Sequence, residues 1–308
     1  MDMLAPIIIF VYNRVDRVKK LIESLQENEE AKNSMLYIFS DGFKGKKDEA
    51  AVNEVRKYVD TLLESKEFSS VSIKQSPENL GLAKSIISGV SEVMEKHNRA
   101  IIIEDDNVVA PDFLDYMNRG LEYYHDDPQI WAISGFSREM SFPEDYQHDI
   151  FVLQRMSSYA WASWKDRWDK TDWAMNDYPG FLWNHKARRK FDECGEDRSL
   201  MMDAQACGKI SSWAIRFEYS MVKNNMYSVI PVISRTFCSG NDGSGTHSKK
   251  EIHDFDAKLS DGTKRVQFEH VEPDRRIREE FVKPYKQPMY RMFIRNFDKI
   301  LQYYSRKL

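Results

Sequence analysis

The chain has 308 residues, of which 42% are hydrophobic and 31% are charged, and its net charge is −4. This composition is typical of a folded globular protein and excludes a mainly disordered chain. The small negative charge argues against a nucleic-acid-binding protein, and no apolar run reaches the roughly 18 residues that span a bilayer.

Strands and helices are predicted to alternate along the first third of the chain. Continuous apolar runs predict buried strands at 6–14, 35–42 and 100–106, and a short strand with a turn at 71–81. Apolar residues at helical spacing predict helices at 16–28, 48–65 and 82–96 between these strands. This alternation is typical of right-handed βαβ units and predicts an α/β fold with a mostly parallel central sheet.

The rest of the chain is less regular. A helix is predicted at 111–127 and a strand at 130–136, and the region 137–270 is irregular and rich in tryptophan. No linker rich in proline, glycine or serine divides this region from what precedes it. We therefore expect one domain over 1–270, with halves at 1–136 and 137–270, followed by a basic helical extension over 271–308.

Three adjacent carboxylates, Glu104, Asp105 and Asp106, follow a buried strand in the stretch IIIEDDNVVAPDF (101–113). Like charges at a desolvated strand end repel one another, and a hard cation would relieve that repulsion. Oxygen ligands suit Mg²⁺ or Mn²⁺, and the absence of a neighbouring histidine or cysteine disfavours zinc. The alternative is a solvated acidic turn that places charge near the start of the following helix.

Two other strand ends should lie at the same edge of the sheet, where ligands of parallel sheets bind. Arg14 follows the first strand and could contact phosphate, or it could be a surface charge that opens a helix. Asp41 follows the second strand and could accept the imide N–H of a uracil, or it could serve an Asp-Gly turn.

A third feature at this edge is the segment PENLGLAK (77–84), which enters a helix through Gly81. A glycine there would let a diphosphate approach the N-terminus of the helix, and Lys84 would add positive charge. The segment is not a Walker A motif, because it lacks the G-K-[ST] sequence.

Three segments in this order resemble the N-acetylglucosaminyltransferase I family and its bacterial relatives, which are inverting, nucleotide-sugar-dependent glycosyltransferases of the GT-A fold. The segment IIIEDDNVVAPDFLDYMNRGLEYYHDDPQIWAISGF (101–136) is similar to their donor-site region. RMSSYAWASWKDRW (155–168) resembles their turn and helix start near the donor sugar and acceptor. VIPVISRTFCSGNDGSGTHS (229–248) resembles the segment and loop that close over the diphosphate.

The resemblance implies a GT-A fold, a UDP-sugar donor and Mn²⁺ or Mg²⁺, with residues 1–136 binding the nucleotide-sugar and 137–270 facing the acceptor. Asp106 would bind the metal, while Glu104 and Asp105 would face the sugar and the ribose. Arg14 and Asp41 would hold the nucleotide.

The same resemblance also implies two residues in the later loop. Ser244 and His247 would lie near the phosphates, and His247 would be a second candidate metal ligand.

An inverting transfer needs a carboxylate that takes the proton of the acceptor hydroxyl. In GT-A enzymes this acid belongs to an acidic pair that opens a helix, but Ser211 and Ser212 stand at the matching place here. The segment CGEDRSLMMD (194–203) offers Asp197 and Asp203, and we predict Asp197 as the first candidate. Its alternative role is to cap or charge the first turn of a helix.

Five tryptophans lie close together in the sequence and could be platforms for sugar faces. Core packing is the alternative, because three of them have the i, i+3, i+7 spacing of one helix face. We expect Trp168 in the core and consider Trp161 or Trp164 as residues of the site. The five are Trp161, Trp164, Trp168, Trp173 and Trp183.

The cysteines are odd in number and none has C-x-x-C spacing. This pattern excludes an obvious zinc knuckle and indicates a reducing compartment. We expect buried thiols at Cys194, Cys207 and Cys238.

The C-terminal stretch 283–308 carries basic residues interleaved with aromatic and aliphatic ones, and its one acid is Asp298. Such a segment could lie on an anionic membrane, which would suit a lipid-linked acceptor. It could equally be a helix docked on the domain with its charged face in water.

These features predict an inverting, metal-dependent hexosyl- or N-acetylhexosaminyltransferase that moves a sugar from a UDP-sugar to a glycan or lipid-linked glycan. The bacterial resemblance suggests assembly of surface polysaccharide or oligosaccharide in the cytoplasm, with peripheral contact at the inner membrane face if the tail binds lipid. The alternatives are a non-catalytic nucleotide-sugar or glycan-binding protein and a sugar-phosphate nucleotidyltransferase. No nucleic-acid partner is expected.

Overall fold

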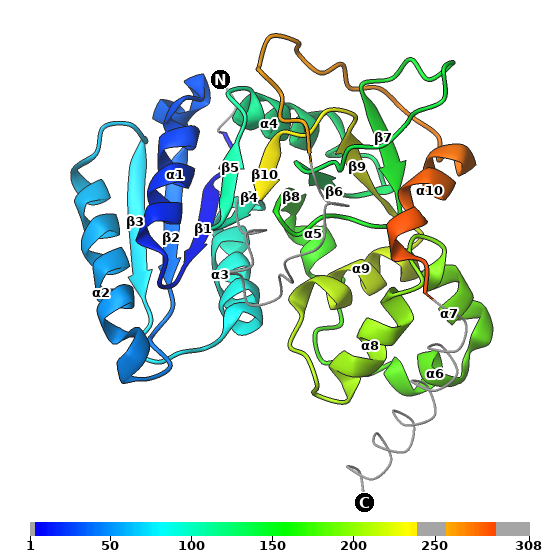
Figure 1. The fold of residues 1–308 in the computed structure, drawn as a ribbon, viewed down its shortest axis with the longest axis horizontal. Helices are drawn as coiled ribbons and strands as arrows, with labels where there is room; N and C mark the ends of the chain where they lie inside the picture. The colour runs from blue at the N-terminus through cyan, green and yellow to red at the C-terminus, as the bar shows by residue number, and fades with distance from the viewer. Residues whose placement is uncertain (1–3, 239–256, 288–308) are drawn as a thin grey trace, which may run out of the picture.

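A computed structural model describes residues 4–238 and 257–287 of the chain. Its centre is an eight-stranded sheet with the strand order β3-β2-β1-β4-β8-β6-β9-β7 (Figure 1). A smaller sheet pairs β5 (Asn107–Val109) with β10 (Thr236–Cys238). The strands of the large sheet are β1 (Ile7–Val11), β2 (Met35–Ser40), β3 (Ser70–Gln75), β4 (Arg99–Glu104), β6 (Ile130–Ser134), β7 (Ile150–Leu153), β8 (Ala160–Trp164) and β9 (Tyr227–Pro231).

The large sheet is mostly parallel, as the sequence predicts. β1 pairs in parallel with β2 and β4, and β2 pairs in parallel with β3. β8 is inserted antiparallel between β4 and β6, β9 runs parallel to β6, and β7 is an antiparallel edge strand. This arrangement confirms the predicted α/β architecture with helices on both faces of the sheet.

The strands bury both faces because successive side chains point to opposite sides. Ile7 and Ile9 of β1 lie in a core with the helices α1 (Val15–Gln26), α2 (Lys46–Thr61) and α4 (Phe113–Tyr123). Ile8 and Phe10 lie in the opposite core with α3 (Leu82–His97) and α9 (Trp213–Lys223). Continuous apolar strands are therefore required, and this explains the unbroken IIIFV run of β1.

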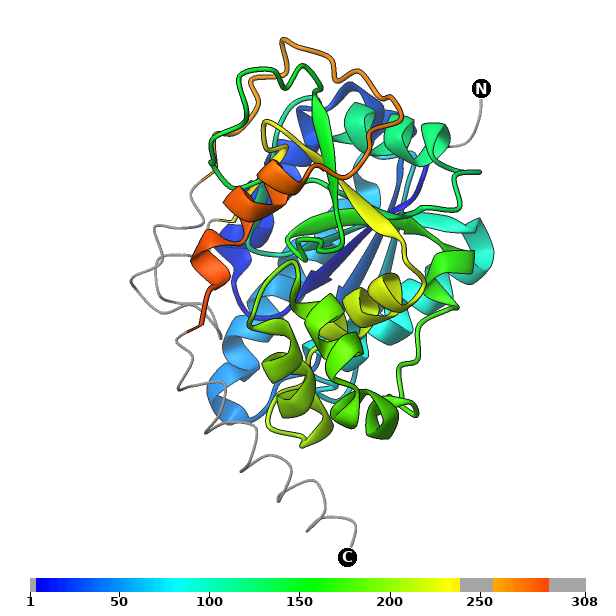
Figure 2. The same cartoon turned by 90° about the vertical axis from the view of Figure 1, so that its right-hand side faces the viewer.

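The C-terminal half adds a helical group and a strap, the segment 275–285 that contains the helix α10 (Arg275–Phe281) and the turn η5 (Lys283–Tyr285). The helical group has a core of its own, and Figure 1 shows it below one end of the sheet. It consists of α6 (Tyr178–Trp183), α7 (His185–Asp192), α8 (Arg198–Ala206) and α9. Helix α10 (Arg275–Phe281) packs on β7 and β9 through Ile277 and Phe281, on the outside of the molecule (Figure 2). Short elements complete the list: α5 (Lys165–Trp168) and the 3₁₀ turns η1 (Glu29–Asn33), η2 (Leu62–Glu64) and η5 (Lys283–Tyr285).

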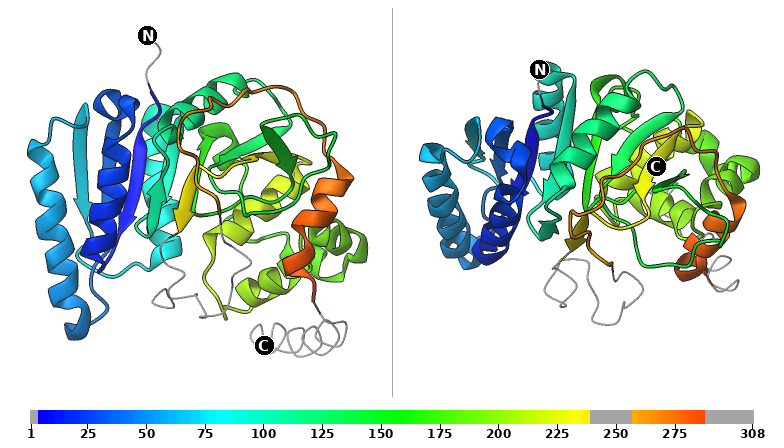
Figure 3. Two further views of the ribbon diagram at one scale, coloured as in Figure 1. Left: turned by 45° about the horizontal axis from the view of Figure 1, so that its top comes forward. Right: turned by 90° about the horizontal axis from the view of Figure 1, so that it is seen from above.

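Figure 3 shows the N-terminal half, blue to cyan, and the later half, green to orange, side by side along the sheet. The division at residues 136 and 270 stays a prediction, because the sheet takes strands from both halves. Within the described ranges, no helix is both long and apolar enough to cross a membrane. The membrane role of the basic tail falls mostly beyond residue 287, outside the described residues.

One predicted element differs at the carboxylates. The expected strand 100–106 ends at Glu104, while Asp105 and Asp106 form a turn that leads into β5. The three-residue strand β5 is too short for a period-2 pattern to identify it. Its partner β10 lies more than 120 residues later in the sequence, so no local signal could reveal the pairing.

The tryptophan spacing was also misleading. Trp161 and Trp164 lie on strand β8 rather than on a helix, and they enter opposite cores. The helical interpretation is therefore wrong, but the core assignment is confirmed, because Trp161, Trp164 and Trp168 are all buried. The site role considered for Trp161 or Trp164 is not supported, since neither side chain is exposed. The three cysteines are buried thiols, as predicted.

The end of α1 anchors the segment that follows the acidic turn. Asn28 is buried, accepts the backbone N–H of Leu114 at 2.8 Å and donates to the carbonyl of Ala110 at 3.1 Å. Ser24 accepts the N–H of Val109 at 3.1 Å. These bonds fix β5 and the start of α4 against α1.

We predict that Asn28→Ala lowers the free energy of unfolding by about 1–3 kcal/mol, because it leaves buried backbone groups without partners. Asn176→Ala is the matched control, since Asn176 is exposed and its side chain bonds to Asp172 nearby. The control should stay within about 0.5 kcal/mol of the wild type. Urea unfolding followed by circular dichroism measures both, and equal midpoints and slopes would contradict the anchoring role.

Candidate active site

The structure brings together the strand ends that the sequence places at one edge. Arg14, just after β1, donates from Nη2 to Asp105 Oδ1 at 2.6 Å and lies 3.4 Å from Asp106 Oδ2. Asp41 follows β2, which lies beside β1, and its backbone N–H donates to the carbonyl of Val11. Arg14 and the acidic turn therefore form one connected cluster, and Asp41 lies at the same edge.

Burial and mutual repulsion shape the charges of the acidic turn. Burial, followed by the charges of Asp106 and Asp105, raises the pKa of Glu104 to about 8. Burial also raises the pKa of Asp105 to about 6, although the Arg14 charge opposes this. Burial lowers the pKa of Arg14, but the two aspartates outweigh it and leave that pKa raised. Arg14 thus supplies part of the positive charge that the turn requires.

The carboxylate oxygens of the turn fit a divalent cation whose remaining ligands a substrate would supply. Asp105 Oδ2 is buried and has no hydrogen-bond partner in the part of the chain that the structure describes. Within those same ranges, no three histidine, cysteine or acidic side chains converge on a metal position. Mg²⁺-type ions commonly use one or two carboxylates together with substrate phosphates and water, which this turn could provide through Asp106.

Asp41 organises the neighbouring loop. Its two carboxylate oxygens accept the backbone N–H groups of Gly42, Leu80 and Gly81 at 2.8–2.9 Å and the side-chain amide of Asn79 at 3.1 Å. These four bonds use all four acceptor positions of a carboxylate. They bear out the turn interpretation of Asp41, whereas its contact with a uracil stays a prediction.

The start of α3 lies beside this loop. Gly81 precedes α3 with a φ of 76°, a conformation that L side chains rarely adopt. Lys84 is exposed on α3 and, together with Arg216 of α9, lines a groove of about 350 Å³. Their contacts with phosphate stay predictions. Ser244 and His247 lie outside the described residues.

Two motifs that are far apart in the sequence meet beside the acidic turn. Asp112 of the VAPDF segment forms an ion pair with Arg235 at 3.1 Å, and Arg235 is almost fully buried. The carbonyl of Arg235 also accepts the N–H of Ala110 at 2.9 Å, next to the pairing of β5 with β10. Both segments are part of the resemblance found in the sequence, but no local sequence pattern indicates that residues 112 and 235 are in contact.

Helix α9 approaches the acidic turn with its first residues. Ser212 caps the helix by accepting the N–H of Ile215 at 3.3 Å, as expected for a serine at this position. The side chain of the next residue, Trp213, hydrogen-bonds Glu104. Ser211 and Ser212, which stand where the resembled enzymes have their acidic pair, therefore lie next to the turn. This place carries hydroxyl groups instead of carboxylates.

The two predicted bases are both held by guanidinium groups. Asp197 binds Arg155 through both oxygens at 2.8 and 2.9 Å. Burial raises its pKa, but Arg155 more than compensates and the pKa is lowered. Asp203 is buried and binds Arg188 through both oxygens at 2.8 Å and Tyr178 at 3.0 Å. These contacts favour structural roles for both, and a catalytic role stays a prediction.

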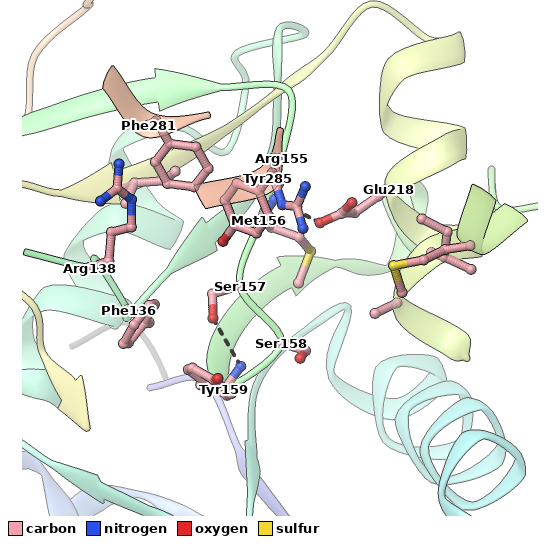
Figure 4. A pocket seen from close by; sticks show the side chains of 14 residues that line it. Phe136, Arg138, Arg155, Met156, Ser157, Ser158, Tyr159, Glu218, Phe281 and Tyr285 are labelled. Atoms are coloured by element: carbon pink, nitrogen blue, oxygen red, sulfur yellow. Dashed lines mark hydrogen bonds between the residues drawn. The ribbon is translucent and has the colours of Figure 1, made fainter. Parts of the chain in front are cut away.

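A cavity of about 200 Å³ lies between the segment 155–159, α9 and the C-terminal strap (Figure 4). Its lining includes Arg155, Tyr159, Glu218 and Tyr285. Glu218 accepts the N–H of Met156 at 3.1 Å and the Nε–H of Arg198 at 3.2 Å. Sequence analysis placed the segment 155–168 near the donor sugar and acceptor but singled out neither Arg155 nor Tyr159. It missed Tyr285, because aromatic residues of this kind are common throughout the chain.

We predict that Gly42→Ala destabilises the Asp41 loop, because a Cβ there would lie 2.4 Å from the carbonyl carbon of Glu78. The expected loss is about 1–3 kcal/mol of unfolding free energy. Gly45→Ala is the matched control, since a Cβ at Gly45 meets nothing within 4 Å. Thermal unfolding of both variants measures the difference, and a wild-type midpoint for Gly42→Ala would refute the close contact.

A second prediction concerns pH. In the folded chain Glu104 keeps its proton up to about pH 8, whereas its ordinary value in an unfolded chain is 4.5. Between these values the folded state binds more protons, so this residue makes stability fall as the pH rises. Glu104→Gln should therefore gain stability relative to the wild type from about pH 5 to about pH 8. Urea unfolding with a chelator present measures both slopes, and parallel slopes would contradict the assignment.

Comparisons with known proteins agree with this geometry. Residues 1–190 match the GNT-I family. An alpha-1,3-mannosyl-glycoprotein 2-beta-N-acetylglucosaminyltransferase of Arabidopsis thaliana is 24% identical over 203 residues, which cover 60% of this chain. The matched region spans 44% of that enzyme's length.

Solved structures give more distant likenesses. One is the mannosyltransferase PcManGT from Pyrobaculum calidifontis, in complex with GDP-Man and Mn²⁺, with 13% identity, a TM-score of 0.39 and coverage of 54% of this chain and 46% of that one. Another is S. aureus TarS 1–349, with 10% identity, a TM-score of 0.43 and coverage of 78% and 62%. Neither bears on substrate or mechanism. Since the family match covers more than half of the sequence, and its residues include the acidic turn, this chain belongs to the GNT-I family.

Proposed function

We propose that the protein is a glycosyltransferase that moves a sugar from a nucleotide-sugar to a glycan hydroxyl, with inversion at the anomeric carbon. The observation that carries this proposal is the acidic turn at the edge of the parallel strands, with Arg14 between Asp105 and Asp106. Membership of the GNT-I family supports it. The donor of the proposal is a UDP-sugar, hexosyl or N-acetylhexosaminyl.

In this proposal, Asp106 holds a divalent cation, Mn²⁺ or Mg²⁺, together with the donor diphosphate, and His247 is a further ligand. When bound, the cation neutralises the charge that develops on the leaving nucleoside diphosphate. Arg14 contributes a second positive charge beside the phosphates, because its guanidinium group already lies at the turn. Glu104 and Asp105 face the sugar and the ribose, and Gly81, Lys84 and Ser244 approach the phosphates.

The acceptor hydroxyl attacks the anomeric carbon, and its proton must pass to a base. Glu218 is our first candidate, because it lines the cavity, where its two oxygens accept hydrogen bonds from Met156 and Arg198. Asp197 and Asp203 are the alternatives from the sequence. All three carboxylates are paired with an arginine, and each would have to leave it to act as the base.

A non-catalytic nucleotide-sugar-binding protein is the second candidate function. Ser211 and Ser212 stand at the position of the expected acidic pair, and Ser212 caps α9. A chain of this kind would bind the donor without transferring the sugar. The proposed role in polysaccharide assembly at a membrane surface applies only if the protein is a glycosyltransferase.

The donor site is tested by thermal shift with UDP-GlcNAc, UDP-glucose, UDP-galactose and GDP-mannose, each with and without Mn²⁺. At a ligand concentration of 100 times Kd, binding should stabilise the wild type by about 2.7 kcal/mol. Asp106→Asn should lose the Mn²⁺-dependent part, while Asp126→Asn should keep it, since Asp126 is an exposed residue at the far end of α4. If no donor gives a metal-dependent thermal shift, the proposal is wrong.

The base is tested by transfer rates per folded enzyme. Glu218→Gln should lower transfer by about 10²–10⁴-fold while donor binding is retained, because it removes the proton acceptor but keeps the shape. Asp197→Asn and Asp203→Asn should mainly lower stability, since each leaves a buried arginine without its carboxylate. If Glu218→Gln keeps full transfer and Asp197→Asn loses it, Asp197 is the base. If the wild type binds the donor but transfers no sugar, the non-catalytic function is favoured.

A further inference from the structure

The cavity beside the acidic turn is partly built by the end of the chain. Phe281 of α10 and Tyr285 of η5 line it. The strap is fixed to the domain by two short contacts: Arg138 donates to the carbonyl of Glu280 at 2.6 Å, and Arg278 pairs with Glu193 at 2.8 Å. These strap residues lie beyond residues 1–190, the part of the chain that matches the family.

Three charged side chains line the cavity: Arg138, Arg155 and Glu218. The guanidinium group of Arg138 donates to the backbone carbonyls of Glu139 and Glu280. Arg155 is held by both oxygens of Asp197, and its guanidinium group lies 3.7 Å from the ring centre of Tyr285. Glu218 is paired with the fully buried Arg198. Since Arg155 and Glu218 each contact an opposite charge, these two pairs present no strong net charge to a ligand and suit an uncharged ligand better than an ion.

The remaining lining combines rings with hydroxyls. Figure 4 shows Phe136, Tyr159 and Tyr285 around the hydroxyls of Ser157 and Ser158. A sugar ring needs this combination, because its C–H face packs on aromatic carbon while its buried hydroxyls must find hydrogen-bond partners. A cavity of about 200 Å³ lies below the roughly 300–1,000 Å³ of sites for larger ligands, so it has room for one ring.

The cavity also faces the acidic turn. Tyr159 lines it, and burial, followed by charges that include those of Asp106 and Glu104, raises the pKa of Tyr159. These carboxylates are therefore close enough to act on the Tyr159 hydroxyl.

We propose that this cavity is the acceptor subsite and binds one uncharged pyranose, with the ring of Tyr285 as a stacking wall that the C-terminal strap supplies. That the bound sugar is an acceptor rests on the proposed function. Tyr285 is then a residue that determines acceptor specificity, and Ser157 and Ser158 are hydroxyl partners of the ring.

Saturation-transfer NMR on the full chain tests this with the methyl glycosides of glucose, galactose, mannose and N-acetylglucosamine, and with methyl glucuronide as the charged probe. At least one neutral glycoside should give a signal with the wild type. Tyr285→Ala should reduce it at least fivefold, while Tyr285→Phe, which keeps the ring, should retain it. Ser158→Tyr, which fills the cavity and leaves the strap residues unchanged, should also abolish it. Tyr123→Ala is the control, because Tyr123 is an exposed tyrosine of α4 outside the cavity.

The proposal is overturned if no neutral glycoside binds, if both cavity variants leave the signal unchanged, or if the glucuronide binds better than every neutral probe. Donor binding by thermal shift is measured on the same samples to separate the two proposals. Donor binding without glycoside binding would reject the subsite and leave the proposed function standing. Glycoside binding that depends on Tyr285 without any donor binding would reject the transferase and retain the sugar-binding cavity.

Discussion

The arrangement at the sheet edge depends on how three carboxylates at the end of a buried strand are held next to one another. Arg14 meets this constraint by lying between Asp105 and Asp106, where it offsets a repulsion that burial strengthens. Arg14 does not offset the whole effect: burial, together with the neighbouring carboxylates, leaves the pKa values of Glu104 and Asp105 raised. A site with such a deficit is suited to a substrate that arrives with a cation.

The surrounding contacts keep this turn in place. The β5–β10 ladder and the buried Asp112–Arg235 pair fix the chain just after it, and Asn28 and Ser24 attach the same segment to α1. Asp41 holds the neighbouring loop through four bonds. These contacts come from segments that are far apart in the sequence, so the position of the turn depends on tertiary structure and not on its own residues alone.

The opposite wall of the site differs in character. Helix α9 begins with serines beside Glu104, and the acids that could replace the missing pair are bound to arginines in the helical group or lie on the cavity wall. In our proposal the donor side is concentrated in one short stretch, whereas the acceptor subsite is assembled from the segment 155–159, α9 and the strap. Variation in those later segments could change the acceptor without disturbing the turn.

The sequence by itself determined the alternation of strands and helices, the parallel sheet and the edge that carries Arg14, Asp41 and the acidic triplet, because period and polarity report burial directly. It also located the serine cap of α9. It misassigned Trp161 and Trp164 to a helix, because a short apolar run is compatible with both a buried strand and one face of a helix. Only the tertiary structure decided that β5 pairs with β10, that Asp197 and Asp203 face arginines, and that Tyr285 reaches the cavity. Those facts depend on contacts between distant segments, which no local pattern encodes.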